Sequence, residues 1–144
     1  MQVTPKNVDK TLGQRTHIAN DGSIMIAPDV NTWIGEVKAR PDSEAVGMML
    51  AHRGVVRGCS RSGEPVGAMI LTVDRSRLDE VLAEARTWEG VFAVYGWVNE
   101  GLLAIGDDIM SILVAGDIRE NVFSALQRLV ALIKTEVVSE SETP

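Results

Sequence analysis

The chain has 144 residues, 45% of them hydrophobic, and carries a formal net charge of −6 at pH 7. This length supports one packed domain and is too short for two ordinary ones. The acidic balance excludes an extended nucleic-acid surface, which needs Lys and Arg clustered on one face, although a few local cations suffice to hold an anionic small molecule.

Residues that form disulfides or bind metals are scarce. Cys59 is the only cysteine and the chain has two histidines, so we expect neither a disulfide framework nor a metal site. This cysteine usage fits a reducing, cytoplasmic setting. No apolar run is long enough to cross a bilayer, and the N-terminal stretch MQVTPKNVDKTLGQR lacks the apolar core of a signal peptide. We therefore expect a soluble protein without a membrane partner.

Polar residues dominate positions 1–24, which contain few large apolar groups, and we expect a flexible N-terminal extension there. A single domain is predicted over residues 25–140, followed by an acidic tail at 141–144. The domain begins with a short helix within 28–40, because apolar residues recur there at helical spacing until Pro41. These residues are Val30, Trp33, Ile34 and Val37.

Two apolar segments follow, separated by a short polar loop. Residues 45–58 are rich in apolar and β-branched side chains, which predicts a mostly buried strand. Residues 59–64, CSRSGE, predict a turn, and 65–74 predict a second strand that pairs with the first as a hairpin. An amphipathic helix is then predicted over 75–88, with its apolar face formed by Leu78, Val81, Leu82, Ala85 and Trp88.

Residues 90–116 predict two apolar strands with two turns between them. The first turn is expected at Asn99 to Gly101 and the second at Gly106 and Asp107, where glycine and short polar side chains interrupt the apolar pattern. A short final strand is expected in 134–140, KTEVVSE.

Between these strands, residues 116–134 predict a long helix. Asp117 is the expected N-cap, and Glu120 three residues later completes a capping-box pattern. The helix carries an apolar stripe that must face a core: Val122, Phe123, Leu126, Leu129, Val130 and Ile133.

The order strand, strand, helix, strand, strand, helix, strand predicts the fold class. We expect an α+β domain with a mainly antiparallel sheet and two helices packed on one face, as in ferredoxin-like or α/β-hammerhead arrangements. A fold of this class does not specify a function.

Three cations are candidates for binding an anion. Arg57 ends a strand beside a glycine and a loop, where its guanidinium can reach a phosphate or carboxylate, although pairing with a surface acid explains it equally well. Arg119 lies in the first turn of a helix, where a cation opposes the helix dipole unless an anion lies nearby. Lys134 ends the same helix, where a cation is favourable without any function.

Two further side chains are candidates for a chemical role, His52 and Cys59. His52 lies in the middle of a strand, where a histidine is more often structural than catalytic. Cys59 lacks the neighbours that activate a nucleophile, so we expect it to be incidental. The chain has no phosphate loop, dinucleotide fingerprint or nucleophile elbow.

Four short motifs occur in a fixed order along the chain. Gly47 begins a strand that ends in Gly-Val-Val-Arg at 54–57, and a Gly-x-Leu-x-x-Gly-Asp-like turn spans 101–107. The helix start at 118–123 and the pair Ile133-Lys134 complete the set. Together they resemble the large, catalytic subunit of molybdopterin synthase over roughly residues 24–140.

The resemblance implies sulfur transfer. A small ubiquitin-like sulfur-carrier subunit would insert its C-terminal glycine thiocarboxylate beside cyclic pyranopterin monophosphate, and two sulfurs would be added to build the dithiolene of molybdopterin. Arg57 and Arg119 would hold the substrate phosphate or a developing oxyanion, and Lys134 would position the thiocarboxylate or carry protons. The family implies a homodimer with its sites near the dimer interface, and no resident cofactor.

The sequence departs from the family pattern at two catalytic positions. Ile118 stands where the family has a histidine before the helix arginine, and the second lysine expected after Lys134 is missing, with Ser141 near its spacing. These departures leave an alternative open: a non-catalytic paralogue of the same fold that binds a pterin-like anion or docks a partner protein. A third possibility is an oligomerising domain without a ligand.

Overall fold

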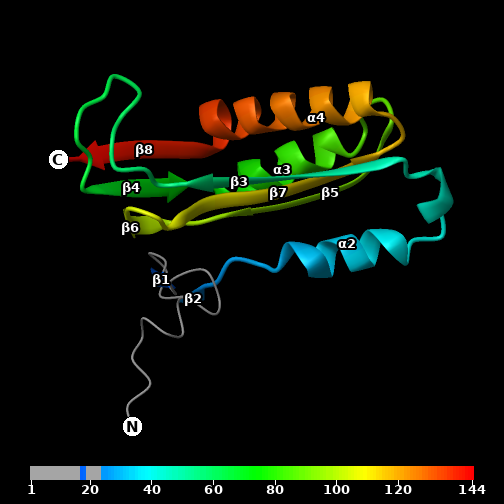
Figure 1. Ribbon diagram of the computed structural model, residues 1–144, viewed down its shortest axis with the longest axis horizontal. Helices are drawn as coiled ribbons and strands as arrows, with labels where there is room; N and C mark the ends of the chain where they lie inside the picture. The colour runs from blue at the N-terminus through cyan, green and yellow to red at the C-terminus, as the bar shows by residue number, and fades with distance from the viewer. Residues whose placement is uncertain (1–16, 19–23) are drawn as a thin grey trace, which may run out of the picture.

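The computed structural model describes residues 17–18 and 24–144 (Figure 1). Most of the predicted N-terminal extension, 1–24, therefore lies outside the described residues. The elements in chain order are β1 (His17–Ile18), β2 (Ile24–Met25), α2 (Val30–Lys38), η1 (Ser43–Ala45), β3 (Met48–Val55), β4 (Ala68–Val73), α3 (Arg75–Ala85), β5 (Val91–Val98), β6 (Gly101–Ala104), β7 (Asp108–Gly116), α4 (Arg119–Leu132), η2 (Ile133–Val137) and β8 (Val138–Thr143).

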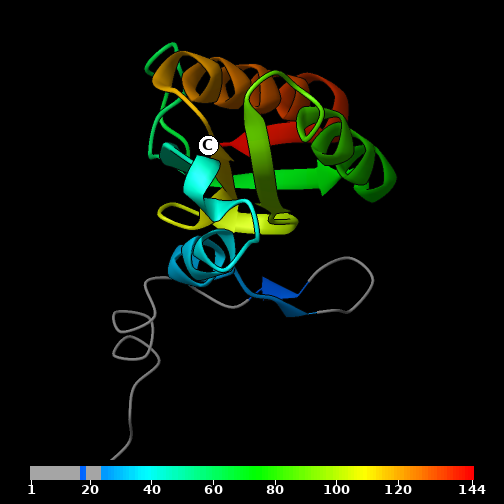
Figure 2. The same ribbon diagram turned by 90° about the vertical axis from the view of Figure 1, so that its right-hand side faces the viewer.

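Two three-stranded antiparallel sheets form the body of the fold, with strand orders β3-β7-β5 and β6-β4-β8. Helices α3 and α4 cover one side, and α2 lies on the other (Figures 1 and 2). This arrangement confirms the α+β class and the two helices on one face, and it adds a third helix on the opposite face.

The central strand β7 carries both layers of the core. All nine of its residues are buried, as expected for a strand covered on both faces. Ile112 and Val114 pack under α3 and α4, whereas Leu113 and Ala115 pack with Val37 of α2. Alternate side chains of a strand point to opposite faces, so a single apolar run serves both helix layers.

The predicted hairpin between 45–58 and 65–74 is wrong. β3 pairs with β7, from Met48 opposite Gly116 to Val55 opposite Asp108, and β4 pairs instead with β6 and β8. The intervening loop passes the chain from one sheet to the other. The expectation that 45–58 forms a mostly buried strand is wrong as well. β3 lies at the edge of its sheet, with β7 on one side and no partner strand on the other within the described chain. Its residues are therefore partly buried or exposed.

The predicted capping box at the start of α4 does not form. Ile118 occupies the N-cap position, while the Asp117 carboxylate accepts hydrogen bonds from the Ile118 backbone N–H and the Asn121 side chain. These two hydrogen bonds lower the pKa of Asp117. Gly90 permits this arrangement, because its φ of +74° and the closeness of Asn121 exclude a Cβ.

The C-terminal strand is longer than expected. β8 runs from Val138 to Thr143, and Thr143 pairs with Ala68 of β4. Residues 141–143, expected in an acidic tail, therefore belong to the β6-β4-β8 sheet.

Candidate functional site

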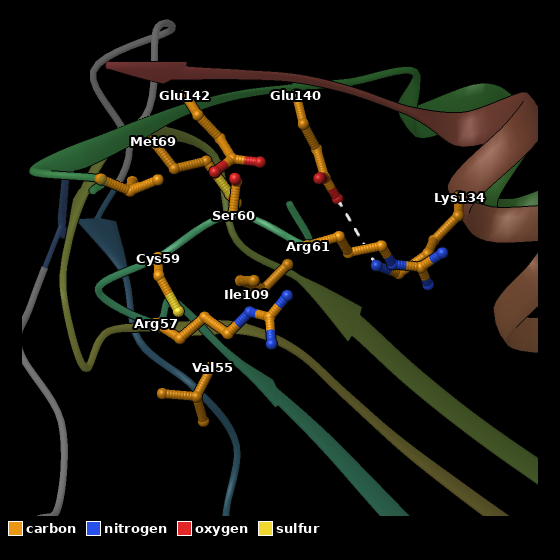
Figure 3. A pocket seen from close by; sticks show the side chains of 11 residues that line it. Val55, Arg57, Cys59, Ser60, Arg61, Met69, Ile109, Lys134, Glu140 and Glu142 are labelled. Atoms are coloured by element: carbon orange, nitrogen blue, oxygen red, sulfur yellow. Dashed lines mark ion pairs between the residues drawn. The ribbon is translucent and has the colours of Figure 1, made fainter. Parts of the chain in front are cut away.

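A cleft of about 210 Å³ opens where the loop between β3 and β4 meets the C-terminal end of α4 and the strand β8. Figure 3 shows the side chains of Arg57 and Lys134 in this cleft, brought there by segments 77 positions apart in the chain. The structure thus joins two of the three predicted cations in one site. Its lining consists of Val55, Arg57, Cys59, Ser60, Arg61, Val66, Met69, Ile109, Lys134, Glu140 and Glu142.

A bulge at the end of β3 sets the direction of the Arg57 side chain. The register with β7 shifts between Gly54 and Val55, and such a shift changes the direction in which the following side chains point. Val56 is then buried in the core, while its neighbours Val55 and Arg57 are exposed and line the cleft. The Val56 backbone N–H donates to the Asp107 carbonyl, which fixes the strand end in this orientation.

Lys134 lies on a single π-helical turn, Ile133–Val137, that continues α4. Ile133 and Val137 are both buried, which anchors the turn on the core and leaves Lys134 exposed toward the cleft. π-Turns of this kind are frequent at functional sites. The Lys134 ammonium lies 3.8 Å from the Glu140 carboxylate, and an ion pair of this length between two solvent-accessible side chains is weak.

The charges around the cleft suit an anionic ligand. Arg57, Arg61 and Lys134 supply three positive charges, against the carboxylates of Glu140 and Glu142. Sequence reasoning missed Arg61, Glu140 and Glu142. The one signal in the sequence is that Glu140 and Glu142 are two positions apart in a strand, which puts them on one face. The pairing of β8 with β4 was not evident from the sequence.

Cys59 also lines the cleft and is exposed.

Arg119 is not part of this cleft. It is the first residue of α4 and is exposed, whereas Lys134 follows the helix's last turn. At a rise of 1.5 Å per residue, about 22 Å of helix separates the two positions. A single chain therefore does not unite Arg119 with Arg57 and Lys134.

A second hollow, a groove of about 420 Å³, lies between β3 and α4. Its lining is mainly apolar and consists of Leu50, His52, Phe123, Leu126, Gln127 and Val130. Phe123 was predicted to face the core, but 54% of it is exposed. The apolar stripe of α4 is wider than the face of the helix that contacts the sheets. Val122, Ala125 and Leu129 fill that contact, so Phe123 at the edge of the stripe stays exposed.

His52 contributes the titratable group of this groove. Partial burial of the imidazole, followed by the positive charge of Lys134, lowers the pKa of His52 from its ordinary 6.5. His52 is therefore electrostatically coupled to the cleft lysine.

No cluster of three or more His, Cys, Asp or Glu side chains suited to a metal occurs among residues 17–18 and 24–144. None of the helices in this described part of the chain is long and apolar enough to span a membrane.

Comparisons with known proteins agree with this fold. A family model described as MoaE protein matches residues 29–136. Among solved structures, the molybdopterin biosynthesis MoaE protein from Burkholderia ambifaria MC40-6 is 25% identical and aligns with a TM-score of 0.65, over 83% of this chain and 80% of that one. No curated protein matches the sequence.

Two more distant structures share the fold. Molybdopterin synthase from Staphylococcus aureus is 21% identical, with a TM-score of 0.60 over 69% of this chain and 76% of that one. The complex of subunits 1 and 2 of the molybdopterin-converting factor from Helicobacter pylori 26695 is 14% identical, with a TM-score of 0.58 over 81% of this chain and 79% of that one.

The fold and the site thus define a class of protein: an α+β domain with a cationic cleft at the end of its long helix. The chain belongs to the MoaE family, the large subunits of molybdopterin synthase, which confirms the resemblance inferred from the motifs. This membership supports a role in molybdenum cofactor biosynthesis.

Proposed function

We propose that this protein transfers sulfur from the C-terminal thiocarboxylate of a small carrier subunit to cyclic pyranopterin monophosphate, forming molybdopterin. The observation that carries the proposal is the cleft that unites Arg57 and Lys134, two of the three residues that the family motifs marked. Three cations around about 210 Å³ fit a phosphate-bearing substrate that is approached by an anionic thiocarboxylate.

Each of the two residues has a distinct role in this proposal. The Arg57 guanidinium holds the substrate phosphate, since arginine presents two parallel donors to such a group. Lys134 positions the thiocarboxylate and stabilises the negative charge that develops on its carbonyl oxygen. The weak pairing with Glu140 leaves the lysine ammonium available to a bound anion.

Arg119 joins the site in a homodimer. If a twofold axis crosses α4 between Leu126 and Gln127, Arg119 of one copy lies opposite Lys134 of the other, because both are equally far from that point. The same pairing places Phe123 opposite Val130 and covers the exposed aromatic ring. Two cations brought together in this way favour an anion between them.

The sulfur carrier is the second protein partner. One of the similar solved structures is a complex of the two subunits of a molybdopterin-converting factor, which supports a two-subunit assembly here. We place the reaction in the cytoplasm, since the exposed cleft residue Cys59 is a free thiol.

A specific observation favours a second candidate function. The cleft holds Glu140 and Glu142 and lacks a second lysine, and Ile118 replaces the family's histidine. A non-catalytic paralogue that binds a pterin-like anion or docks a partner needs Arg57 and the fold, but not the complete set of catalytic groups.

Reconstitution separates the two candidates. The purified protein is mixed with a carrier bearing a C-terminal thiocarboxylate and with cyclic pyranopterin monophosphate, and dithiolene formation is followed. We expect product from the wild type and none from Lys134→Ala, with Lys38→Ala as a control on a distant exposed lysine of α2. Binding of both reactants without product would support the paralogue instead.

A further inference from the structure

We propose that His52 is the proton-transfer residue of the cleft, acting on the water that releases the carrier from the substrate. This inference rests on the proposed sulfur transfer. It concerns a group that the family motifs do not include and that lies on a different element from the missing histidine at Ile118.

The groove and the cleft adjoin along β3 and along α4. Along α4, Leu126 and Val130 line the groove, and Lys134 follows Val130 by four residues, about one turn, on the same side of the helix. Along β3, Leu50, His52 and Gly54 share one face, because side chains of a strand alternate. Gly54 is followed directly by Val55 of the cleft lining. His52 therefore lies where the groove meets the cleft.

The missing side chain of Gly54 leaves the imidazole open toward the cleft. A Cβ on this glycine would lie 3.8 Å from His52 Nε2 and 3.6 Å from Cβ of Ile109, which itself lines the cleft. Nε2 thus lies beside Gly54, close to the end of the strand that leads into the cleft. In this proposal, the attacking water is held there, between the imidazole and the Lys134 end of the cleft.

The charged groups around His52 keep its imidazole ready to accept a proton. Partial burial disfavours the imidazolium, and so does the positive charge of Lys134. The pKa of His52 is therefore lowered from 6.5, and the neutral base dominates at pH 7. The neighbouring β7 residue Ile112 is apolar, and the groove residues of α4 carry no charge. Beyond Gly54, the cleft adds Arg57, Arg61, Glu140 and Glu142.

The reaction requires such a base at one step. The thiocarboxylate sulfur attacks the substrate carbon and forms a C–S bond while a C–O bond at that carbon breaks, the electron pair leaving on the oxygen. Carrier and substrate are then joined through a thioester. Water must then attack the acyl carbon: its oxygen forms the new C–O bond, the C–S bond breaks, and the electron pair stays on sulfur. His52 takes a proton from the attacking water and returns it to the departing thiolate. The products are the substrate thiol and the carrier carboxylic acid, which ionises to carboxylate and releases a proton to solvent.

The test follows the covalent intermediate. A single turnover of the full-length protein with thiocarboxylated carrier and cyclic pyranopterin monophosphate is quenched at intervals, and mass spectrometry measures the carrier–substrate thioester. In His52→Gln we expect the thioester to accumulate and its hydrolysis to slow by about 10²–10⁴-fold, the usual contribution of general acid–base catalysis. The matched control is His17→Gln, the same substitution at the chain's other histidine, which leaves hydrolysis unchanged.

Two further readouts separate a chemical role from a structural one. The hydrolysis rate of the wild type falls as pH decreases through the pKa of His52, and this acidic limb disappears in His52→Gln. Gly54→Ala keeps the imidazole and fits at ordinary van der Waals distances, yet it places a methyl group beside Nε2. We expect this variant to melt like the wild type and to hydrolyse the thioester more slowly.

The outcomes distinguish the two proposals. If the wild type forms neither thioester nor product while both reactants bind, the proposed sulfur transfer fails and this role fails with it. If the wild type forms product and His52→Gln hydrolyses the thioester at the wild-type rate with the same acidic limb, the role of His52 alone is overturned.

Discussion

Replacing Arg57 by alanine separates substrate binding from folding. The guanidinium is exposed, and no hydrogen bond or ion pair holds it among residues 17–18 and 24–144. Substitution of such a surface residue changes the free energy of unfolding by about 0.5 kcal/mol or less. A hydrogen bond to a charged group contributes about 1.5–3 kcal/mol, so losing the phosphate contact weakens substrate binding about 10- to 150-fold.

Titration calorimetry with cyclic pyranopterin monophosphate measures this effect, and thermal melting checks the fold. The matched control is Arg128→Ala, because Arg128 stacks on Trp88, 4.1 Å from its ring centre, on a part of α4 outside the cleft. The control variant keeps the wild-type Kd. An Arg57→Ala protein that melts like the wild type and binds the substrate with unchanged affinity would refute the assignment of the phosphate to this cleft.

Three further predictions follow from the packing and the charges. Phe123→Asp places a carboxylate in the proposed twofold contact, so sedimentation should show a monomer where the wild type is a dimer; a wild-type monomer would contradict that interface. Leu129→Ala removes a fully buried core side chain and should lower the free energy of unfolding by about 2–5 kcal/mol in urea melts, and a smaller loss would mean that the core collapses around the site. The fold lowers the pKa of His52, so unfolding takes up a proton below pH 6.5, and the free energy of unfolding should fall as pH decreases from 6.5. In Lys134→Gln, NMR titration should show a higher pKa for His52 than in the wild type. An unchanged pKa would exclude the electrostatic coupling.

Local patterns predicted the elements well. The three- and four-residue spacing of apolar positions predicted α3 and α4 close to their observed bounds, since an amphipathic stripe depends only on neighbouring turns. The glycine and aspartate signals at 99–107 predicted the turns on either side of β6. Strand pairing was the main error. It depends on contacts between distant segments. β7 pairs with β3 because β7 is the central strand, buried at all nine of its residues, and needs a partner strand on each side.

The site was predictable only in part, for the same reason. Arg57 and Lys134 came from motifs at the ends of a strand and a helix, and the fold brings these ends together. The contribution of Arg61 required knowing that its loop folds back toward the end of α4. The distance of Arg119 from the cleft follows from helix length alone, but a place for it in the site requires a second copy of the chain.

A crystal structure of the protein bound to cyclic pyranopterin monophosphate tests the central claim most directly. We predict the phosphate in the cleft at the end of α4, within hydrogen-bond distance of the Arg57 guanidinium and beside Lys134. A substrate bound elsewhere, with both side chains still facing solvent, would contradict the assignment of this cleft as the site of sulfur transfer.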